Sequence, residues 1–321
     1  MKNSEPPQQR LFVTGANGFI GRVFCSRASQ HVVTACVRQS KNESPGIHQT
    51  LEIDNLSNKI QWGPMLEGMD CVVHLAARAH VIEEVSSNPL QLFREINRDA
   101  TLHLARSAAE AGVKRFIYMS SIGVLGAKNV SGPFHHHSPF APSEPYAISK
   151  MEAEIGLREI SEETGLQVVS IRPPLVYGPG AIGNFRRLVR LVDRGLPLPL
   201  ASMSGKKSLI SVQNLSDLIV QCITAPVTGY LPLVVSDGSH WSTAELIRLI
   251  ARYLGKSPRL LPFPVLLLET AASLLGKSKE VRKLAAPLEI DSGETSRILQ
   301  WTPVQRPEDG LREAVESYIS P

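Results

Sequence analysis

The chain has 321 residues, 43% of them apolar and 20% charged, a globular composition that excludes the disordered, collagen-like and disulfide-scaffold classes. The formal net charge is only +4 and no run of basic residues is longer than two, so we expect no nucleic-acid partner. The length allows one large domain or two coupled ones with a sizeable buried core.

Apolar runs rich in β-branched residues alternate with amphipathic stretches along the first half of the chain. The apolar runs predict strands at 11–15, 31–37, 71–77, 115–121 and 166–174. The amphipathic stretches predict helices at 18–30, 89–111 and 146–164. Continuous apolar strands separated by helices are typical of a parallel sheet covered on both faces. The sequence therefore predicts an α/β fold with a doubly wound parallel sheet.

Beyond about residue 179 the pattern is less regular. Helices are predicted at 184–195, 214–223, 242–254, 264–276 and 307–319, with short strands near 208–212 and 231–235. We expect a flexible tail over 1–10, a large α/β domain over 11–178, and a smaller region over 179–321. Some segments of that region are expected to return to the large domain, and the rest to complete a substrate cleft.

Cysteine usage and apolar runs bear on location. The four cysteines show no CxxC spacing and are expected to be free thiols in a cytoplasmic protein: Cys25, Cys36, Cys71 and Cys222. No apolar segment precedes Leu11, so no secretory signal is expected. The apolar run 260–275 is interrupted by Pro262, Pro264 and Glu269, so we expect a core helix, with a membrane-surface helix as the alternative and no membrane insertion.

A glycine-rich turn joins the first predicted strand to its helix. Gly15, Gly18 and Gly21 follow GxxGxxG spacing. Glycines there permit a tight turn, close approach of the backbone to a pyrophosphate and close helix–strand packing, while the helix N-terminus supplies N–H donors. A turn that serves packing alone is the alternative, but the place at the first strand–helix junction favours a dinucleotide site.

The end of the second predicted strand bears on cofactor choice. It carries Arg38 and no carboxylate, whereas a carboxylate there binds the adenosine ribose of NAD in such sites. A guanidinium at this position favours NADP because it can hold the 2′-phosphate. The alternatives are a solvated basic loop and an arginine that stacks on adenine.

Tyr146 and Lys150 lie one helical turn apart in YAISK. An ammonium beside a phenol lowers the phenol pKa, so we expect Tyr146 to exchange a proton with a carbinol or carbonyl near neutral pH. Ser120 and Ser121, at the end of an upstream strand, offer a hydroxyl to the same substrate oxygen.

Several segments, in order and spacing, resemble the extended short-chain dehydrogenase/reductase superfamily over almost the whole chain: GANGFIG (15–21), HLAA (74–77), the strand ending at 121, YAISK (146–150) and RPPLVYGPG (172–180). Within it the chain resembles the nucleotide-sugar branch of the NAD-dependent epimerase/dehydratase family, related to UDP-galactose 4-epimerase. VVHLAARAHV (72–81), GNF (183–185), RGLPLPL (194–200) and KSLISVQNLSDLI (207–219) also resemble UDP-4-keto-6-deoxy-N-acetylhexosamine reductases of O-antigen pathways.

The resemblance implies a Rossmann-type fold with a smaller, mostly C-terminal substrate-binding region, and it implies residue roles. Ser121, rather than Ser120, matches the catalytic hydroxyl, Tyr146 the acid/base and Lys150 its cofactor-ribose partner, while Asn97 matches a structural helix asparagine. The implied NAD(P)-binding residues are Gly15, Asn17, Gly18, Phe19, Ile20, Gly21, Arg38, Asp54, Leu75, Ala76, Ala77, Tyr146, Lys150 and Pro173. The implied substrate-binding residues are Arg78, Ser121, Asn184, Lys207, Arg282 and Leu288.

Some positions depart from the family pattern. Lys207 replaces the usual arginine, which keeps the charge and loses bidentate phosphate geometry. Leu175 stands where epimerases commonly have a sugar-contacting asparagine, and Arg282 is the candidate for the phosphate-binding arginine. Leu288 matches a gate where a bulky tyrosine restricts some epimerases to non-acetylated hexoses, so its smaller side chain predicts N-acetylated substrates.

Three consecutive histidines suggest a metal site, but the sequence does not favour one. His135, His136 and His137 resemble a metal tract, but consecutive histidines cannot all face one ion in regular structure, so we expect a solvated or lid loop and no metal. His74, inside an apolar strand, is expected to be a hydrogen-bonded core histidine. His80 follows the same strand, where cleft contacts are an open possibility.

The resemblance implies an enzyme that transfers hydride between NAD(P), with NADP favoured, and C4 of a UDP-linked hexose. The leading expectation is a UDP-4-keto-(6-deoxy)-N-acetylhexosamine 4-reductase of surface polysaccharide biosynthesis. The alternatives are a UDP-hexose or UDP-N-acetylhexosamine 4-epimerase and, more remotely, a non-catalytic NAD(P)-sensing regulator. Helices near 89–111 and 146–164 are implied to form the interface of a homodimer.

Overall fold

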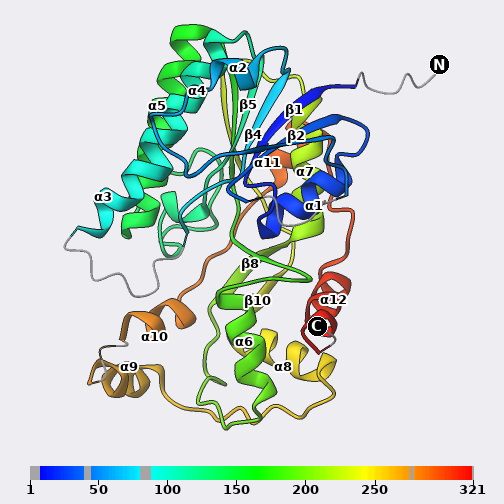
Figure 1. The fold of residues 1–321 in the computed structure, drawn as a ribbon. Coiled ribbons are helices and arrows are strands. Elements are labelled where there is room, and N and C mark those ends of the chain that lie inside the picture. The colour runs from blue at the N-terminus through cyan, green and yellow to red at the C-terminus, as the bar shows by residue number, and fades with distance from the viewer. Residues whose placement is uncertain (1–7, 40–44, 80–87, 275, 277, 320–321) are drawn as a thin grey trace.

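Seven parallel strands form the large sheet of the computed structural model, which describes residues 8–39, 45–79, 88–274, 276 and 278–319 (Figure 1). In spatial order they are β3 (Gln49–Glu52), β2 (Val32–Val37), β1 (Arg10–Thr14), β4 (Cys71–His74), β5 (Arg115–Met119), β6 (Gln167–Arg172) and β9 (Tyr230–Val234). The predicted Rossmann-type sheet is confirmed. Strand order reverses between β1 and β4, and ligands of such sheets bind at the carboxyl ends of the strands at that reversal.

Helices cover both faces of this sheet, because successive strand residues point to opposite sides and both sides are apolar. On one face, Leu11 and Val13 join a core with residues of α1 (Phe19–Arg27) and α7 (Val212–Thr224). On the other, Phe12 and Val72 join a core with residues of α2 (Gly63–Leu66), α4 (Ala100–Glu110) and α5 (Pro145–Thr164). A short helix α3 (Pro89–Arg94) and a π-helical turn η1 (Glu95–Asp99) precede α4.

A three-stranded sheet lies below the large one and carries the smaller core (Figure 1). Its strands are β10 (His240–Ser242), β8 (Lys206–Ser211) and β7 (Leu175–Tyr177). Tyr177, Phe185 and Ile247 are among the buried residues of this core. The surrounding helices are α6 (Asn184–Asp193), α8 (Thr243–Tyr253) and α12 (Pro307–Ile319), and α11 (Gly293–Leu299) returns toward the large sheet.

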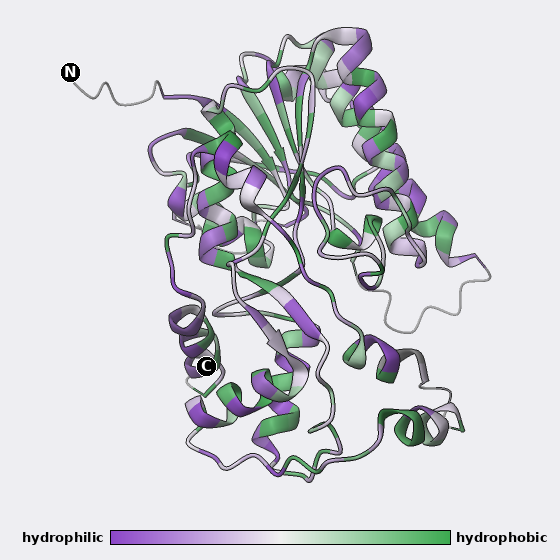
Figure 2. Ribbon diagram, turned by 180° about the vertical axis from the view of Figure 1, so that it is seen from behind, coloured by the Kyte–Doolittle hydropathy of each residue, from purple (hydrophilic) through white to green (hydrophobic). Residues whose placement is uncertain are grey.

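The expected core helix over 260–275 is wrong for its described residues. Helix α9 (Val265–Ser273) buries no residue, and Leu266 and Leu267 are 75% and 55% exposed. Figure 2 shows this apolar helix beside α10 (Ser278–Ala285), at the lower edge and away from both sheets. An apolar run predicts a core helix only if a second apolar surface covers it. None of the helices in the described ranges has the length and apolarity needed to cross a bilayer.

All four cysteines are buried free thiols, as expected for small apolar side chains. Burial raises the pKa of the Cys25, Cys36 and Cys71 thiols to about 12. These thiols are therefore protonated and unreactive at neutral pH.

Candidate active site

The glycine loop after β1 is shaped for backbone approach. Gly15 has φ +73°, and a Cβ there would lie 2.7 Å from the backbone nitrogen of Ala76. A Cβ at Gly21 would collide with the carbonyl of Gly15, so only glycine allows α1 to pack this closely. Gly18 caps α1, whose first turn has neither a side-chain cap nor an acidic residue. Its N–H groups and positive dipole end therefore fit the pyrophosphate of a dinucleotide.

Side chains around this loop lie at the carboxyl edge of the sheet. The Asn17 amide donates a 2.9 Å hydrogen bond to the carbonyl of Gln39, which ties the loop to the segment after β2. Arg38 follows β2 directly and is exposed, and Asp54, just beyond β3, is exposed as well. The structure thus places Arg38 and Asp54 on the side where the adenosine half of a dinucleotide lies in such sheets. Of the two residues that begin α1, Phe19 packs against the smaller core and Ile20 against the large one.

The segment after β4 forms the second wall of the loop. The N–H of Leu75 donates to the Thr14 carbonyl at 3.2 Å, and the N–H of Ala76 to the Thr14 hydroxyl at 3.4 Å. Ala77 follows and is exposed. His74 is buried between the hydroxyls of Thr14, at 2.7 Å, and Thr101, at 3.0 Å. Burial, together with the Lys150 charge, lowers the pKa of His74 to about 3, so it is the expected neutral core histidine.

The two serines after β5 have different environments. Ser120 is 3% exposed and its hydroxyl donates to Glu154, away from solvent. Ser121 is half-buried, and its oxygen accepts a 3.2 Å hydrogen bond from the N–H of Gly123. The N–H of Ile122, the residue directly after Ser121, donates to the Pro173 carbonyl at 2.9 Å, so Pro173 lies beside the serine. Ser121 is the more exposed of the two serines, whereas the Ser120 hydroxyl is bonded to Glu154 in the core.

Tyr146 and Lys150 lie in the first turns of α5, next to Ser121. A Cβ at Gly123 would lie 3.4 Å both from the Ser121 oxygen and from the Cβ of Ala147. The Tyr146 ring packs edge-on against Phe93, with ring centroids 5.9 Å apart.

The predicted lowering of the Tyr146 pKa by Lys150 is wrong for this state. Burial raises the pKa of Tyr146 to about 12. The Lys150 ammonium instead donates a 2.7 Å hydrogen bond to the Met119 carbonyl and lies 4.5 Å from the centroid of the Tyr118 ring. The ammonium is therefore held by groups other than the phenol, and desolvation decides the phenol pKa.

A buried ion pair between Glu154 and Arg172 lies next to Lys150 and affects its pKa. Glu154, one turn after Lys150 and 1% exposed, accepts hydrogen bonds from the Arg172 guanidinium, the closest 2.6 Å long, and from the Tyr230 hydroxyl at 2.6 Å. Burial lowers the pKa of Lys150 to about 7, and the Glu154 charge opposes this shift. This network was not predicted from the sequence, although an arginine inside the apolar run 166–174 and a glutamate one turn from Lys150 are signals of it.

Asn97 joins two walls of the site, as expected of a structural asparagine. It is 1% exposed and lies in the π-helical turn η1, a distortion often found at functional sites. Its carbonyl oxygen accepts from the Arg78 N–H at 2.9 Å, and its amide donates to the Arg78 carbonyl at 3.1 Å and to the Ser149 hydroxyl at 3.1 Å. The backbone of Arg78 is thereby fixed near α5. His80 lies outside the described residues.

The two cations predicted to bind the diphosphate both have partners within this chain. The Lys207 ammonium is hydrogen-bonded to the carbonyls of Lys283, at 2.7 Å, and Ala286, at 2.5 Å, at the end of α10. Burial lowers its pKa to about 8. Arg282, on the exposed side of α10, pairs with Glu269 at 3.2 Å. Two carbonyls hold the Lys207 ammonium, whereas the Arg282 side chain is 67% exposed and its exposed ion pair leaves it accessible to a ligand.

The other two substrate-side residues frame the region between the sheets. Asn184 is exposed at the first position of α6. Leu288 is held through its backbone, which donates to the Lys206 carbonyl and accepts from the Ser208 N–H, both at 2.8 Å. Its side chain packs on a cluster that includes Ile122, immediately after Ser121.

Known proteins resemble this chain over most of its length. A model of the "NAD dependent epimerase/dehydratase family" matches residues 11–232. A UDP-glucose 4-epimerase of Vibrio cholerae is 38% identical over 314 residues, which are 96% of this chain and 95% of that protein. An N-acetyl-alpha-D-glucosaminyl-diphospho-ditrans,octacis-undecaprenol 4-epimerase of Escherichia coli O157:H7 is 26% identical over 88% of this chain and 87% of that protein. Among solved structures, a UDP-glucose 4-epimerase from Thermotoga maritima with UDP-glucose has the same fold, with a TM-score of 0.76 at 21% identity over 97% of this chain and 99% of that one.

Proposed function

The chain belongs to the NAD-dependent epimerase/dehydratase family, and from this premise we propose that it is a 4-epimerase that transfers hydride between NAD(P) and C4 of a UDP-linked hexose. The observation that carries the proposal is the grouping of Ser121, Tyr146 and Lys150 at the carboxyl edge of the sheet, next to a loop shaped for a dinucleotide. The similarity to a Vibrio cholerae 4-epimerase over almost the full length of both chains supports it. The reductase expected first from the sequence becomes the second candidate.

Each residue of the group has a chemical task in this proposal. Tyr146 accepts the proton of the C4 hydroxyl as hydride leaves C4, and returns it when hydride comes back. Burial raises the pKa of Tyr146 to about 12 in the free protein, so that pKa must fall once cofactor and substrate are bound. Ser121 donates a hydrogen bond to the same oxygen and so positions it. Lys150, held by the Met119 carbonyl, supports the cofactor ribose and stabilises the phenolate once formed. NAD(P), when bound on the glycine loop, supplies and accepts the hydride.

A 4-reductase remains as a second candidate because of Arg38. The guanidinium is exposed directly after β2, with no carboxylate at the strand end. A 2′-phosphate matches this charge, and NADPH is consumed by reductases, whereas an epimerase returns its hydride. We therefore propose NADP as the favoured cofactor in either case.

The sugar and the assembly state are further parts of the proposal. Leu288 beside the Ser121 segment leaves room for a 2-acetamido group, which favours UDP-N-acetylhexosamines. Helices α4 and α5 pack side by side and are proposed to form the interface of a homodimer. The buried, unpaired thiols suit the reducing cytoplasm.

One experiment separates the candidates. Purified protein is incubated with UDP-hexoses, UDP-N-acetylhexosamines and UDP-4-keto-6-deoxy-N-acetylhexosamine, with and without NADPH or NADH, and products are identified by NMR. An epimerase interconverts the C4 epimers without net cofactor consumption. A reductase oxidises one equivalent of reduced cofactor per 4-keto sugar. If no substrate is turned over, or Tyr146→Phe turns it over at the wild-type rate, the proposal is wrong.

A further inference from the structure

The loop that carries the three consecutive histidines is tied to the chain just before α11. A parallel bridge joins Phe134 to Ile290. The N–H of Phe134 donates to the Glu289 carbonyl at 2.8 Å, and the N–H of Asp291 to the Phe134 carbonyl at 2.9 Å. These bonds fix His136, on one side of the bridge, relative to the first turn of α11 on the other.

A tight turn explains how two consecutive histidines face the same way. The N–H of Ser138 donates to the His135 carbonyl at 2.9 Å, and the Ser138 hydroxyl accepts from the N–H of His135 at 3.0 Å, so His136 and His137 occupy the centre of the turn. Side chains do not alternate there as they do in a strand. The two rings lie with centroids 3.9 Å apart. Of the two roles expected for this loop, solvated or lid, the solvated one is incorrect for His136, which is only 9% exposed.

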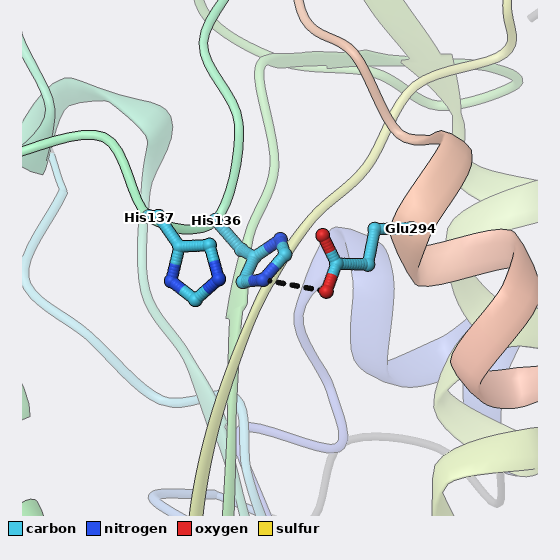
Figure 3. Close-up of side chains that lie close together, drawn as sticks. All are labelled: His136, His137 and Glu294. Carbon is cyan, nitrogen blue, oxygen red and sulfur yellow. Dashed lines mark ion pairs between the residues drawn. The ribbon is translucent and has the colours of Figure 1, made fainter.

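Glu294, in the first turn of α11, completes a cluster of three possible ligands (Figure 3). Its carboxylate lies 2.9 Å from Nε2 of His136, and one ligand atom from each of His136, His137 and Glu294 lies within 4.8 Å of the others. A tetrahedral zinc ion, about 2.0–2.2 Å from nitrogen and oxygen ligands, places its ligand atoms about 3.3 Å apart. His136 and Glu294 already lie 2.9 Å apart, so the exposed His137 ring is the ligand that would have to turn toward them.

We propose that His136, His137 and Glu294 bind a divalent transition-metal ion, zinc foremost, which fastens the histidine loop to α11. Two imidazoles and one carboxylate suit zinc and its neighbours in the transition series better than magnesium or calcium, which prefer oxygen ligands alone. Three protein ligands leave a fourth position for water. The site is separate from the hydride-transfer group, and its test does not depend on the proposed function.

The surroundings of His136 favour a ligating imidazole. Its carbonyl accepts a 3.2 Å hydrogen bond from Arg172, whose charge is neutralised by Glu154, so the backbone under the ligand is held in place.

The test is a titration of tag-free, EDTA-dialysed full-length protein with ZnCl₂ by calorimetry, with CoCl₂ absorption spectra to identify the ligand geometry. We expect one ion per chain with a Kd of about 10 μM or tighter. Glu294→Gln and His137→Ala, both at accessible positions, should weaken binding about 10-fold or more. His135→Ala is the matched control, since His135 belongs to the same run but lies outside the cluster, and it should bind within threefold of wild type.

A second readout guards against loss of fold. ZnCl₂ should raise the melting temperature of the wild type and of His135→Ala, but not of Glu294→Gln, while circular dichroism shows all three folded. Three results would overturn the proposal: a zinc Kd weaker than about 10 μM, an unchanged zinc affinity in Glu294→Gln, or an equal loss of zinc affinity in His135→Ala and His137→Ala. Each would mean that the three histidines bind metal only as exposed histidines do.

Discussion

Glu154→Gln is expected to destabilise the protein strongly, because it removes the charge of a buried ion pair while keeping the shape of the side chain. The side chains of Arg172 and Glu154 are 2% and 0% exposed. Removing one partner of such a pair leaves the other charge buried and costs about 3–5 kcal/mol. With an unfolding entropy of about 2.1 cal/mol/K per residue, a chain of 321 residues loses about 1.5 °C per kcal/mol. The melting temperature should therefore fall by about 4–7 °C.

The matched control is Glu163→Gln near the end of the same helix. Glu163 pairs with Arg106, but their side chains are 56% and 52% exposed, so the loss should stay below about 1 kcal/mol. Both variants are compared with wild type by differential scanning calorimetry at one pH. If the Glu154 variant melts within about 1.5 °C of the Glu163 variant, the buried pair does not stabilise the fold as argued.

The same substitution should also change the pH profile of activity. The Glu154 charge raises the pKa of Lys150 against the effect of burial, so its removal lowers that pKa further below about 7. If the Lys150 ammonium is needed for turnover, the alkaline limb of kcat then moves to lower pH in Glu154→Gln and stays in place in Glu163→Gln. Superimposable profiles would show that the two side chains are not coupled.

Three further substitutions test the site. Tyr146→Phe should lower turnover roughly 10²-fold or more with cofactor binding nearly intact, since only the transferable proton is lost, and turnover within threefold of wild type would remove Tyr146 from the mechanism. Arg38→Ala should weaken NADP(H) more than NAD(H) in fluorescence titrations, and equal losses would mean that Arg38 only stacks on adenine. Wild type should prefer UDP-N-acetylhexosamines over UDP-hexoses by about 10-fold in kcat/KM, and Leu288→Tyr should narrow that ratio; an unchanged ratio would contradict the gate assignment.

The sequence predicts what short-range patterns determine. Continuous apolar strands between amphipathic helices are enough to predict a doubly wound sheet, because a strand that is apolar at every position must be buried on both faces. The glycine loop is equally local, since the tight turn at Gly15 and the close packing at Gly21 follow from their spacing. The choice of Ser121 over Ser120 as the proposed catalytic serine rests on the family resemblance, and the hydrogen bond of Ser120 to Glu154 is a contact that the sequence did not predict.

Features that depend on distant partners were not predictable in this way. Taken singly, Arg172 is expected at the exposed end of a strand and Glu154 on the exposed face of a helix. Only the fold shows that the two side chains are paired in the core. The apolar run of α9 indicates a core helix, but in the fold its residues are at most partly covered and none is buried. Phenol and ammonium at helical spacing predict a lowered pKa at Tyr146, but the spacing does not reveal that the Met119 carbonyl holds the ammonium.

The segment 286–291 connects the substrate side of the site to its chemistry. On one side its backbone pairs with β8, through 2.8 Å hydrogen bonds between Leu288 and both Lys206 and Ser208. On the other side the Glu289 carbonyl accepts from the N–H of Phe134, in the loop that leads directly to α5 and Tyr146. Leu288, the proposed gate residue, is thus hydrogen-bonded through its own segment to the loop that precedes α5, which carries the proposed proton donor Tyr146. A substitution that shifts Leu288 should therefore move the sugar relative to Tyr146, and change kcat as well as KM.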